Sequence, residues 1–341
     1  LEEWNWRWML GLETAPAVLY FLCLYLVPES PRWLIMQGRR DEAMTVMSRV
    51  SGPVQASEDI KAISASLAAV GNRQTQQQPL AALFSKPMRL VLSIGLTVAI
   101  LQQITGINSV FFYAPMIFEQ SGIGTDASFM QAVLVGLTNL LFTVFAIALI
   151  DRIGRKPLLI FGVAGIALCM MLLAWGFNAA TYSLSEEAIN GLPAAIDRAL
   201  LHPLLNMTFA SDISFTQAMS NSLGAAVFQE FEAELVSAAI TINPSLILIG
   251  ILGFVACFAI SIGPVMWVLF SELFPNRIRG LAISFVGLVN SGVSFTVQLL
   301  FPWQLANLGN AATFFIYGVF AIIGLLLIAR LLPETPVSYT H

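Results

Sequence analysis

Charged residues are scarce in this chain of 341 residues, where Asp, Glu, Lys and Arg together make up 11%. Soluble proteins carry roughly 25%. The two histidines, His202 and His341, are far apart, and each of the three cysteines lies in an apolar run. The sequence also lacks a P-loop and a glycine-rich nucleotide fingerprint. These absences argue against a zinc cluster, a disulfide framework and a nucleotide cofactor, and we expect no cofactor at all.

Hydrophobic residues are abundant instead, at 57%, and they gather in long runs. A run of about 20 apolar residues is long enough to cross a bilayer as a helix. The sequence predicts an all-α, polytopic membrane helix bundle with seven transmembrane helices, over residues 8–27, 90–118, 129–150, 158–177, 245–270, 281–301 and 312–332.

Two polar intervals separate these spans. Residues 28–89 predict two short amphipathic helices, over 41–50 and 60–70. Residues 178–243 hold seven acids and a single Arg, and helices are expected over 186–199 and 225–240. We interpret the second interval as an insertion that is solvated or lies at the membrane interface, without chemistry of its own.

The basic residues give the bundle an orientation. Of the sixteen Lys and Arg residues, only Arg7 and Arg198 fall on one side of the predicted membrane, and the other fourteen fall on the opposite side. Basic residues favour the cytoplasmic side. The chain is therefore expected in the inner cell membrane, with residues 333–341 as a cytoplasmic tail and residues 178–243 outside.

The most informative stretch is LQQITGINSVFFYAP, at residues 101–115. It places Gln102, Gln103, Asn108 and two hydroxyl residues inside an apolar span. Hydrogen-bonding groups at membrane depth are costly unless they face a wet cavity or another helix. Because amides offer donors and an acceptor together, they suit an uncharged ligand with many hydroxyls. The alternative is a set of hydrogen bonds between helices.

Helix geometry sharpens this prediction. In a continuous helix, Gln103 and Asn108 would point about 140° apart. Gly106 weakens the helix between them, and Pro115 removes a backbone donor. We therefore expect a discontinuous helix, as carriers use at their binding sites.

Five motifs follow one another along the chain: PESPRWL, QQITGIN, DRIGRKP, GPVMWVLFSELFPNRIRG and PET. In this order and spacing they resemble the sugar porter family of the major facilitator superfamily, and most closely its bacterial proton-coupled pentose and hexose symporters. That family has twelve spans in two six-helix halves. The resemblance implies a sixth span at 1–27, a cytoplasmic interdomain loop at 28–89 and the C-terminal six-helix bundle at 90–332, interrupted by the insertion at 178–243. The chain thus looks like a fragment that lacks spans one to five.

The resemblance also implies the site. The family's substrate-binding positions are occupied by Gln102, Gln103, Asn108, Asn139, Trp267 and Asn290. An indole such as Trp267 offers an apolar face and one donor, which suits a sugar ring, although an interfacial tryptophan is the alternative. Ser291 and Phe112 differ from the residues common in the family, so the identity of the sugar is left open.

A cytoplasmic gate is implied by the charged motifs. Its candidate residues are Glu29, Arg32, Asp151, Arg152, Arg155, Glu272 and Arg279. Arg155 has two candidate partners, Glu272 and Glu29. Charges that only set the topology are the alternative.

Together these features predict a monosaccharide carrier that works by alternating access in the lipid bilayer. It would be a monomer when complete, with no nucleic-acid partner. The wet segments offer no nucleophile–base pair, so an enzyme is not expected. Proton coupling is left open, because the family's usual proton-binding acid lies in the first span. A membrane sugar sensor that does not transport, or an inactive truncated carrier, is the alternative.

Overall fold

The computed structural model describes residues 7, 11–71, 83–119, 121, 125–275 and 278–332. The chain forms two compact units, residues 1–78 and 79–341. The boundary between them falls inside the predicted interdomain loop.

The first unit contains four described helices: α2 (Thr14–Leu24), α3 (Pro31–Met36), α4 (Arg40–Ser51) and α5 (Pro53–Gly71). Helix α2 is apolar but only 11 residues long, and none of its residues is buried. It covers part of the predicted span 8–27, whose residues 8–10 lie outside the described residues.

Helices α3, α4 and α5 pack around Leu34, Ala43 and Ile60. The two amphipathic helices predicted for this segment are present as α4 and α5. Helix α5 begins earlier than expected, at Pro53, because proline is well suited to the first turn and Gly52, at a φ of 80°, ends α4 just before it.

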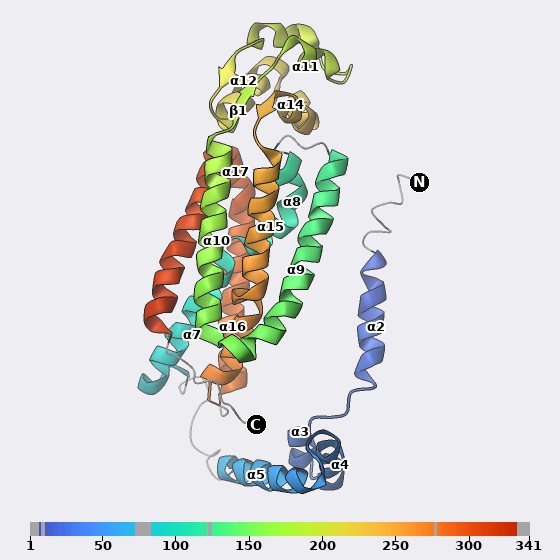
Figure 1. Ribbon diagram of the computed structural model, residues 1–341, viewed down its shortest axis with the longest axis vertical. Coiled ribbons are helices and arrows are strands. Elements are labelled where there is room, and N and C mark those ends of the chain that lie inside the picture. Colours follow the sequence, from blue (N-terminus) through green and yellow to red (C-terminus); the bar gives the residue numbers. More distant parts are fainter. Residues whose placement is uncertain are drawn as a thin grey trace. The chain divides into compact units, whose positions relative to one another are not determined.

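The second unit is a helical bundle (Figure 1). Its helices are α7 (Lys86–Ile104), α8 (Ile107–Glu119), α9 (Thr125–Ile153), α10 (Arg155–Asn178), α15 (Pro244–Ile260), α16 (Ile262–Leu273) and α17 (Arg279–Leu331). By length and composition, five helical stretches among the described residues could cross a membrane.

The last of these stretches consists of two helices. At 53 residues, α17 would be about 80 Å long, whereas the hydrocarbon core is about 30 Å thick. Gly309, with φ 81° and ψ 169°, breaks it into two helices. The break falls between the two predicted spans 281–301 and 312–332, and the number of spans stays a prediction.

Two more of these apolar stretches are interrupted. Helices α7 and α8 are separated at Thr105 and Gly106, and Gly106 has a φ of 85° that favours glycine. Helices α15 and α16 are separated at Ser261. The predicted discontinuous helix is confirmed, and Gly106 is its break, because Pro115 lies inside α8 without ending it.

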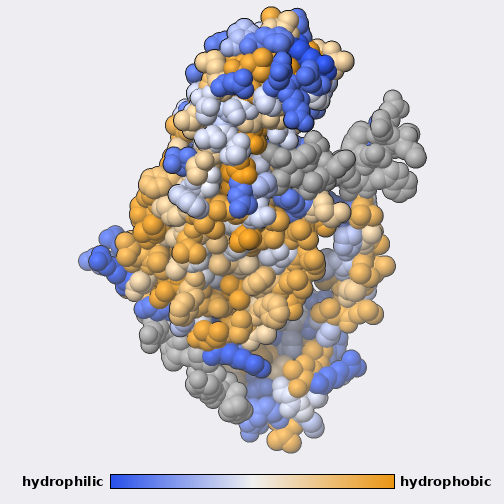
Figure 2. All heavy atoms as spheres, turned by 45° about the horizontal axis from the view of Figure 1, so that its top comes forward, coloured by the Kyte–Doolittle hydropathy of each residue, from blue (hydrophilic) through white to orange (hydrophobic). Residues whose placement is uncertain are grey.

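Small residues allow the central helices to approach closely. A side chain at Gly162 of α10 would collide with Ser261, and one at Gly250 of α15 would come within 2.7 Å of Leu173. Such small-residue contacts are typical of helix interfaces in membranes. By contrast, α9 is mostly exposed, because only 17% of its most apolar stretch is buried. Figure 2 shows apolar side chains over the middle of the bundle, as expected for a surface in contact with lipid.

Residues 179–243 form a small folded insertion at one end of the bundle (Figure 1). Its elements are β1 (Thr181–Ser183), α11 (Glu186–Gly191), the 3-10 helix η1 (Arg198–Leu204), β2 (Thr208–Phe209), α12 (Asp212–Leu223), α13 (Ala225–Glu230), α14 (Glu232–Ala239) and β3 (Ile240–Thr241). The antiparallel strands are ordered β2-β1-β3. Tyr182, Leu201, Phe215, Met219 and Leu235 belong to a core of its own.

The helix predicted over 186–199 is wrong beyond Gly191. Pro193 disfavours a helical conformation at Leu192, which is extended, with ψ 152°. The helix predicted over 225–240 is present but divided at Phe231, where φ is −118°. Helix α12 was not predicted.

Basic residues of the second unit collect at the end of the bundle away from the insertion (Figure 1). These are Lys86, Arg89, Arg152, Arg155, Lys156, Arg279 and Arg330, at the starts, ends and turns of the helices. The insertion holds Arg198. The fold therefore gives the bundle one basic end, as the predicted orientation requires.

Candidate functional site

Amide side chains meet beside the break between α7 and α8. Gln102 and Gln103 lie in the last turn of α7 and are 6% and 7% exposed, and Asn290 of α17 is 7% exposed. Gln103 Nε2 donates to Asn290 Oδ1 at 3.1 Å, and Asn290 Nδ2 donates to Gln102 Oε1 at 2.8 Å. Asn290 Nδ2 also lies 2.9 Å from the carbonyl oxygen of Ala99. The sequence places these amides almost two hundred residues apart, and the fold joins them.

Asn108 joins the group because the helix is broken. It lies in the first turn of α8, and its Nδ2 donates to Gln103 Oε1 and to Ser294 Oγ, both at 2.8 Å. Gln298 Nε2 donates to the same Ser294 hydroxyl at 2.9 Å. We call Gln102, Gln103, Asn108, Asn290 and Ser294 the amide cluster. The turn at Gly106 thus brings together two side chains that a continuous helix would point apart.

The second broken helix also faces the cluster. Gln102 Nε2 lies 3.4 Å and 3.5 Å from the carbonyl oxygens of Gly263 and Ile262, in the first turn of α16. These long contacts are weak hydrogen bonds. The cluster therefore lies where two interrupted helices and α17 converge.

Ser294 and Gln298 were not predicted as site residues. Their signal is present in the sequence, because Asn290, Ser294 and Gln298 recur every fourth residue and so lie on one face of α17. That polar stripe inside an apolar span would have identified them.

Trp267 and Asn139 are not joined to the cluster by any hydrogen bond of the described residues. Trp267 is 49% exposed and packs edge-to-face on Phe270, with ring centroids 6.0 Å apart. Its neighbour Met266 contacts the cluster, with Sδ 3.9 Å from Asn290 Nδ2. Asn139 lies half-buried on α9. The substrate-binding roles of both residues stay predictions.

The residues of the cluster differ in exposure. Gln102, Gln103 and Asn290 are buried, whereas Asn108 and Ser294 are half-buried. A ligand hydroxyl would replace the hydrogen bonds of these two residues first. Because each hydrogen bond contributes about 0.5–1.5 kcal/mol net, such an exchange is nearly neutral and therefore reversible.

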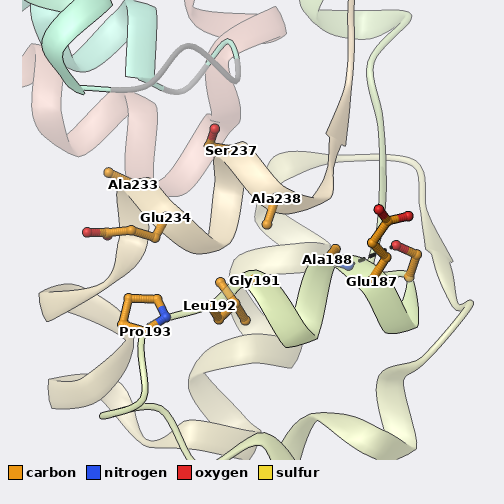
Figure 3. Close-up of a pocket in the computed structure, with 10 residues that line it drawn as sticks. Glu187, Ala188, Gly191, Leu192, Pro193, Ala233, Glu234, Ser237 and Ala238 are labelled. Carbon is orange, nitrogen blue, oxygen red and sulfur yellow. Dashed lines mark hydrogen bonds between the residues drawn. The ribbon is translucent and has the colours of Figure 1, made fainter.

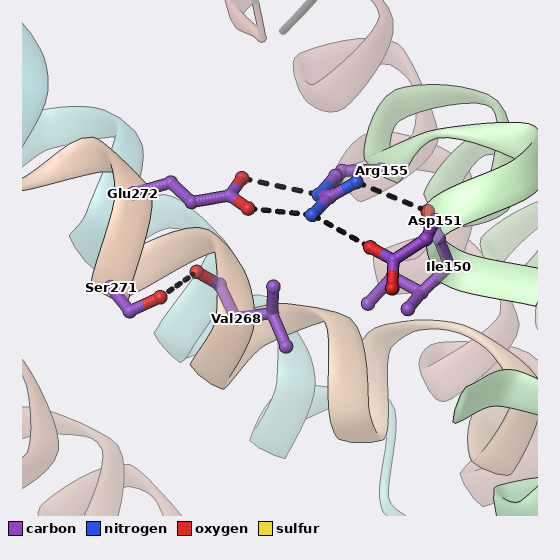
Figure 4. Close-up of polar contacts among 6 residues, drawn as sticks. All are labelled: Ile150, Asp151, Arg155, Val268, Ser271 and Glu272. Atoms are coloured by element: carbon purple, nitrogen blue, oxygen red, sulfur yellow. Dashed lines mark hydrogen bonds and ion pairs between the residues drawn. The ribbon is translucent and has the colours of Figure 1, made fainter. Parts of the chain in front are cut away.

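A charged network lies at the basic end of the bundle (Figure 4). Arg155 makes two parallel contacts with Glu272, Nη2 to Oε1 at 2.6 Å and Nε to Oε2 at 3.1 Å. It also contacts Asp151 Oδ1 at 3.1 Å and the carbonyl oxygen of Ile150 at 3.2 Å. The Arg155 side chain is only 13% exposed, so this bidentate pair is better shielded than an ordinary surface ion pair.

The other candidate gate residues are less connected. Arg279 Nε donates to the carbonyl oxygen of Phe274, just after the end of α16. Arg152 is exposed. Of the two partners expected for Arg155, the structure shows Glu272. Glu29 and Arg32 lie in the first unit, and their parts in a gate stay predictions.

The insertion carries a separate open cavity of about 650 Å³. Figure 3 shows it between α11, with Glu187 and Gly191, and α14, with Glu234 and Ser237. It is lined mainly by small side chains, and its two carboxylates make it acidic. It has no residue in common with the amide cluster.

A bundle of apolar helices, two of them broken beside a cluster of amides, defines a multi-pass membrane protein. The chain belongs to the Sugar (and other) transporter family, whose model matches residues 1–197 and 214–340.

Named relatives agree with this assignment. The chain is 31% identical over 337 residues to the arabinose-proton symporter of Bacillus subtilis, covering 98% of this chain and 59% of that protein. It is 32% identical over 338 residues to the D-xylose-proton symporter of Escherichia coli, covering 97% and 55%. The structure of the xylose symporter XylE bound to 6-bromo-6-deoxy-D-glucose matches with a TM-score of 0.67 at 30% identity, covering 97% of this chain and 57% of that one. The chain thus spans less than three fifths of the length of these relatives.

Proposed function

We propose that this chain forms the larger part of a carrier that moves a monosaccharide across the inner membrane by alternating access, together with protons. The observation that carries the proposal is the amide cluster, buried at membrane depth beside two helix breaks. The relatives named arabinose-proton and D-xylose-proton symporters support both the sugar class and the proton coupling.

The chemistry of the cluster fits a polyhydroxylated ligand. Each amide donates and accepts, so a sugar hydroxyl can take the place of a neighbouring side chain without leaving an unpaired group. Asn108 and Ser294 are the first to exchange, because they are half-buried. The contacts named here use only groups of this chain. Further contacts would come from a region equivalent to the part of the relatives that this chain does not match.

Alternating access needs a contact that forms in one state and opens in another. We assign this role to Arg155, which ties the turn between α9 and α10 to Glu272 near the end of α16. The basic end of the bundle is then cytoplasmic, the C-terminus is cytoplasmic, and the insertion is outside. The working unit is a monomer in the lipid bilayer.

Binding and uptake are tested separately. The purified chain is titrated with D-xylose and L-arabinose, and the variant Asn108→Leu should weaken binding at least tenfold, because it loses two hydrogen bonds. Asn307→Leu is the matched control: Asn307 is an exposed amide of the same helix as Asn290 and donates to the carbonyl oxygen of Trp303 in that helix. Equal affinities in both variants would contradict the proposed site.

Uptake is measured in liposomes with a chimera in which the preceding N-terminal portion of the E. coli D-xylose-proton symporter is joined to this chain. Labelled pentose should accumulate when the outside is acidic and should not accumulate without the gradient. Sugar binding with no uptake under either condition would favour the sensor instead.

A further inference from the structure

A second cavity lies where the insertion meets the bundle. Its volume is about 270 Å³. The insertion contributes α12, α13 and α14, with Thr216, Gln229 and Glu232, and the bundle contributes Met116 of α8 and Asn310 of α17. It is distinct from the amide cluster, and all its lining residues belong to this chain.

Asn310 points to a missing partner in this cavity. Its side chain is 3% exposed, and its Nδ2 donates to Asp212 Oδ2 at 3.0 Å. Its Oδ1 is buried and has no hydrogen-bond partner among the described residues. A buried polar oxygen is costly when it is unpaired, so this acceptor on a residue that lines the cavity indicates a place for a ligand donor.

The other polar groups of the wall all offer acceptors, and two of them are carboxylates. Asp212 and Glu232 supply carboxylates, and Thr216 supplies a hydroxyl. Burial raises the pKa of Glu232, and the nearby Glu119 carboxylate raises it further. No Lys, Arg or His lines the cavity in the part of the chain that the structure describes. The site therefore calls for a ligand with several hydrogen-bond donors and no negative charge.

Apolar surface accompanies these acceptors. Tyr182, Phe215 and Phe228 supply aromatic rings to the same wall. A few placed polar groups on an aromatic wall suit a molecule with hydroxyls on its edge and CH groups on its face. Drug-sized ligands occupy pockets of about 300–1,000 Å³, so a cavity slightly below that range suits a molecule the size of one sugar ring.

We propose that this cavity is an accessory monosaccharide site between the insertion and the outer end of the bundle. The choice of a sugar over another donor-rich molecule rests on the proposed function. Helix α8 connects the two sites, because Met116 lines the cavity and Asn108 belongs to the amide cluster. These residues are eight positions apart, or about 12 Å along a helix. A sugar in the cavity would therefore lie about 12 Å from the amide cluster.

The test is photolabelling of the purified chain in lipid nanodiscs with a D-xylose derivative that carries a diazirine, followed by mapping of the adducts. Adducts are expected within residues 212–236 and 302–310, and excess D-xylose should reduce them at least fivefold. Excess ethanolamine should leave them unchanged. Displacement by ethanolamine but not by D-xylose would overturn the proposal, since the cavity would then be a cation site.

Variants locate the ligand. Thr216→Val and Glu232→Ala should each lower labelling of the cavity at least fivefold, whereas Glu232→Gln should keep it because its amide still accepts. Glu230→Gln is the matched control, because Glu230 is an exposed acid of α13 that does not line this cavity. Equal labelling in Thr216→Val, Glu232→Ala and Glu230→Gln would overturn the proposal.

This experiment tests the accessory site and the proposed function independently. Asn290→Leu should remove adducts from residues 102–108 and leave those of the cavity. If the cavity is labelled and residues 102–108 are not, the accessory site stands and the proposed function does not. If only residues 102–108 are labelled, the accessory site is wrong. Labelling of residues 102–108 in the cavity variants also shows that they are folded.

Discussion

At the scale of the residue, Asn290 is the centre of the amide cluster. It accepts from Gln103 and donates to Gln102 and toward the Ala99 carbonyl oxygen, so its amide is fully used. Asn290→Leu keeps the side-chain volume but removes one hydrogen-bond partner from Gln102 and one from Gln103. We expect a loss of about 1–3 kcal/mol in unfolding free energy and at least tenfold weaker sugar binding. Thermal unfolding in detergent and a sugar titration measure the two effects.

The control for this variant is Asn307→Leu. Among the described residues, Asn307 donates only to the Trp303 carbonyl oxygen of its own helix, and it is exposed. It should change stability by less than about 0.5 kcal/mol. If Asn290→Leu proved equally mild, the cluster would contribute little to either stability or binding.

Arg155 gives a second prediction at this scale. Its guanidinium holds Glu272 and Asp151 at once, and the alanine variant would release both. In the chimeric carrier we expect Arg155→Ala to favour the inward-open state. A cysteine introduced at Met266, which is fully buried beside the cluster, should then react at least threefold faster with a thiol reagent added from the cytoplasmic side.

Arg155→Lys and Lys156→Ala are the comparisons for this experiment. Lysine keeps the charge but loses the two parallel bonds, so its effect should be intermediate. Lys156 is the adjacent base, and its removal tests net charge alone. Thiol reactivity that is the same in Arg155→Ala and Lys156→Ala would mean that these charges serve topology rather than gating.

The sequence could identify the amides but only some of their partners. Gln102, Gln103 and Asn108 stand out as polar residues in an apolar run, and the resemblance pointed to Asn290. Ser294 was missed, because a lone serine is common in membrane helices and only its register on α17 marks it. Trp267 was predicted to face the site, and that role stays a prediction, while its neighbour Met266 is a residue of α16 that contacts Asn290. The break at Ser261 resets the register of α16. The periodicity of the sequence therefore could not predict which α16 side chains contact the cluster.

At the scale of the element, the helix break at Gly106 is what joins Gln103 to Asn108. A φ of 85° is costly for a residue with a Cβ, and that Cβ would lie 3.1 Å from the Tyr317 ring. Gly106→Ala should therefore destabilise the bundle by about 1–2 kcal/mol or straighten the helix and move Asn108 away. Either result should weaken sugar binding, and a titration of the folded fraction measures it.

Gly136→Ala is the matched control for the break. Gly136 lies inside the continuous helix α9, and no heavy atom is within 4 Å of the position of its added Cβ. Alanine there should be neutral or stabilising, by up to about 1 kcal/mol. Unchanged sugar binding in Gly106→Ala would show that the break does not position the site.

Helix α17 shows where element prediction fails. Its first span was predicted to end at Phe301, before Pro302, but the helix continues through this proline to Gly309. Proline is tolerated inside membrane helices because neighbouring groups satisfy the freed backbone. Glycine at a positive φ is the stronger stop, since it turns the chain outright.

At the scale of the whole molecule, the distribution of charge was the most reliable guide. The predicted orientation requires the helix ends that carry basic residues to lie on one side of the membrane. In the second unit, the fold brings these helix ends together at one end of the bundle. The core of the insertion could not be foreseen in the same way. Tyr182 and Phe215 each stand between two hydroxyl residues in the sequence, and only the tertiary fold brings them together with Leu201.

The insertion is joined to the bundle through Asp212, which lies in residues 198–213, the segment that the family model leaves unmatched. Its Oδ2 accepts from the backbone N–H of Asn310 at 2.7 Å, at the start of the last helix, directly after the break at Gly309. A carboxylate at a helix N-terminus satisfies an otherwise free donor and complements the helix dipole. The insertion thus supplies the cap of the last span.

Removal of that cap should loosen the junction and leave both cores intact. Asp212→Ala should cost about 0.5–2 kcal/mol locally, which corresponds to roughly 2- to 30-fold faster amide hydrogen exchange at residues 310–313. Asp197→Ala is the matched control, because Asp197 caps η1 within the insertion through the N–H of Ala199. It should speed exchange near residue 199 and leave 310–313 unchanged. If exchange at 310–313 is the same in both variants, the last span is held by its packing in the bundle, and the insertion rests on it without stabilising it.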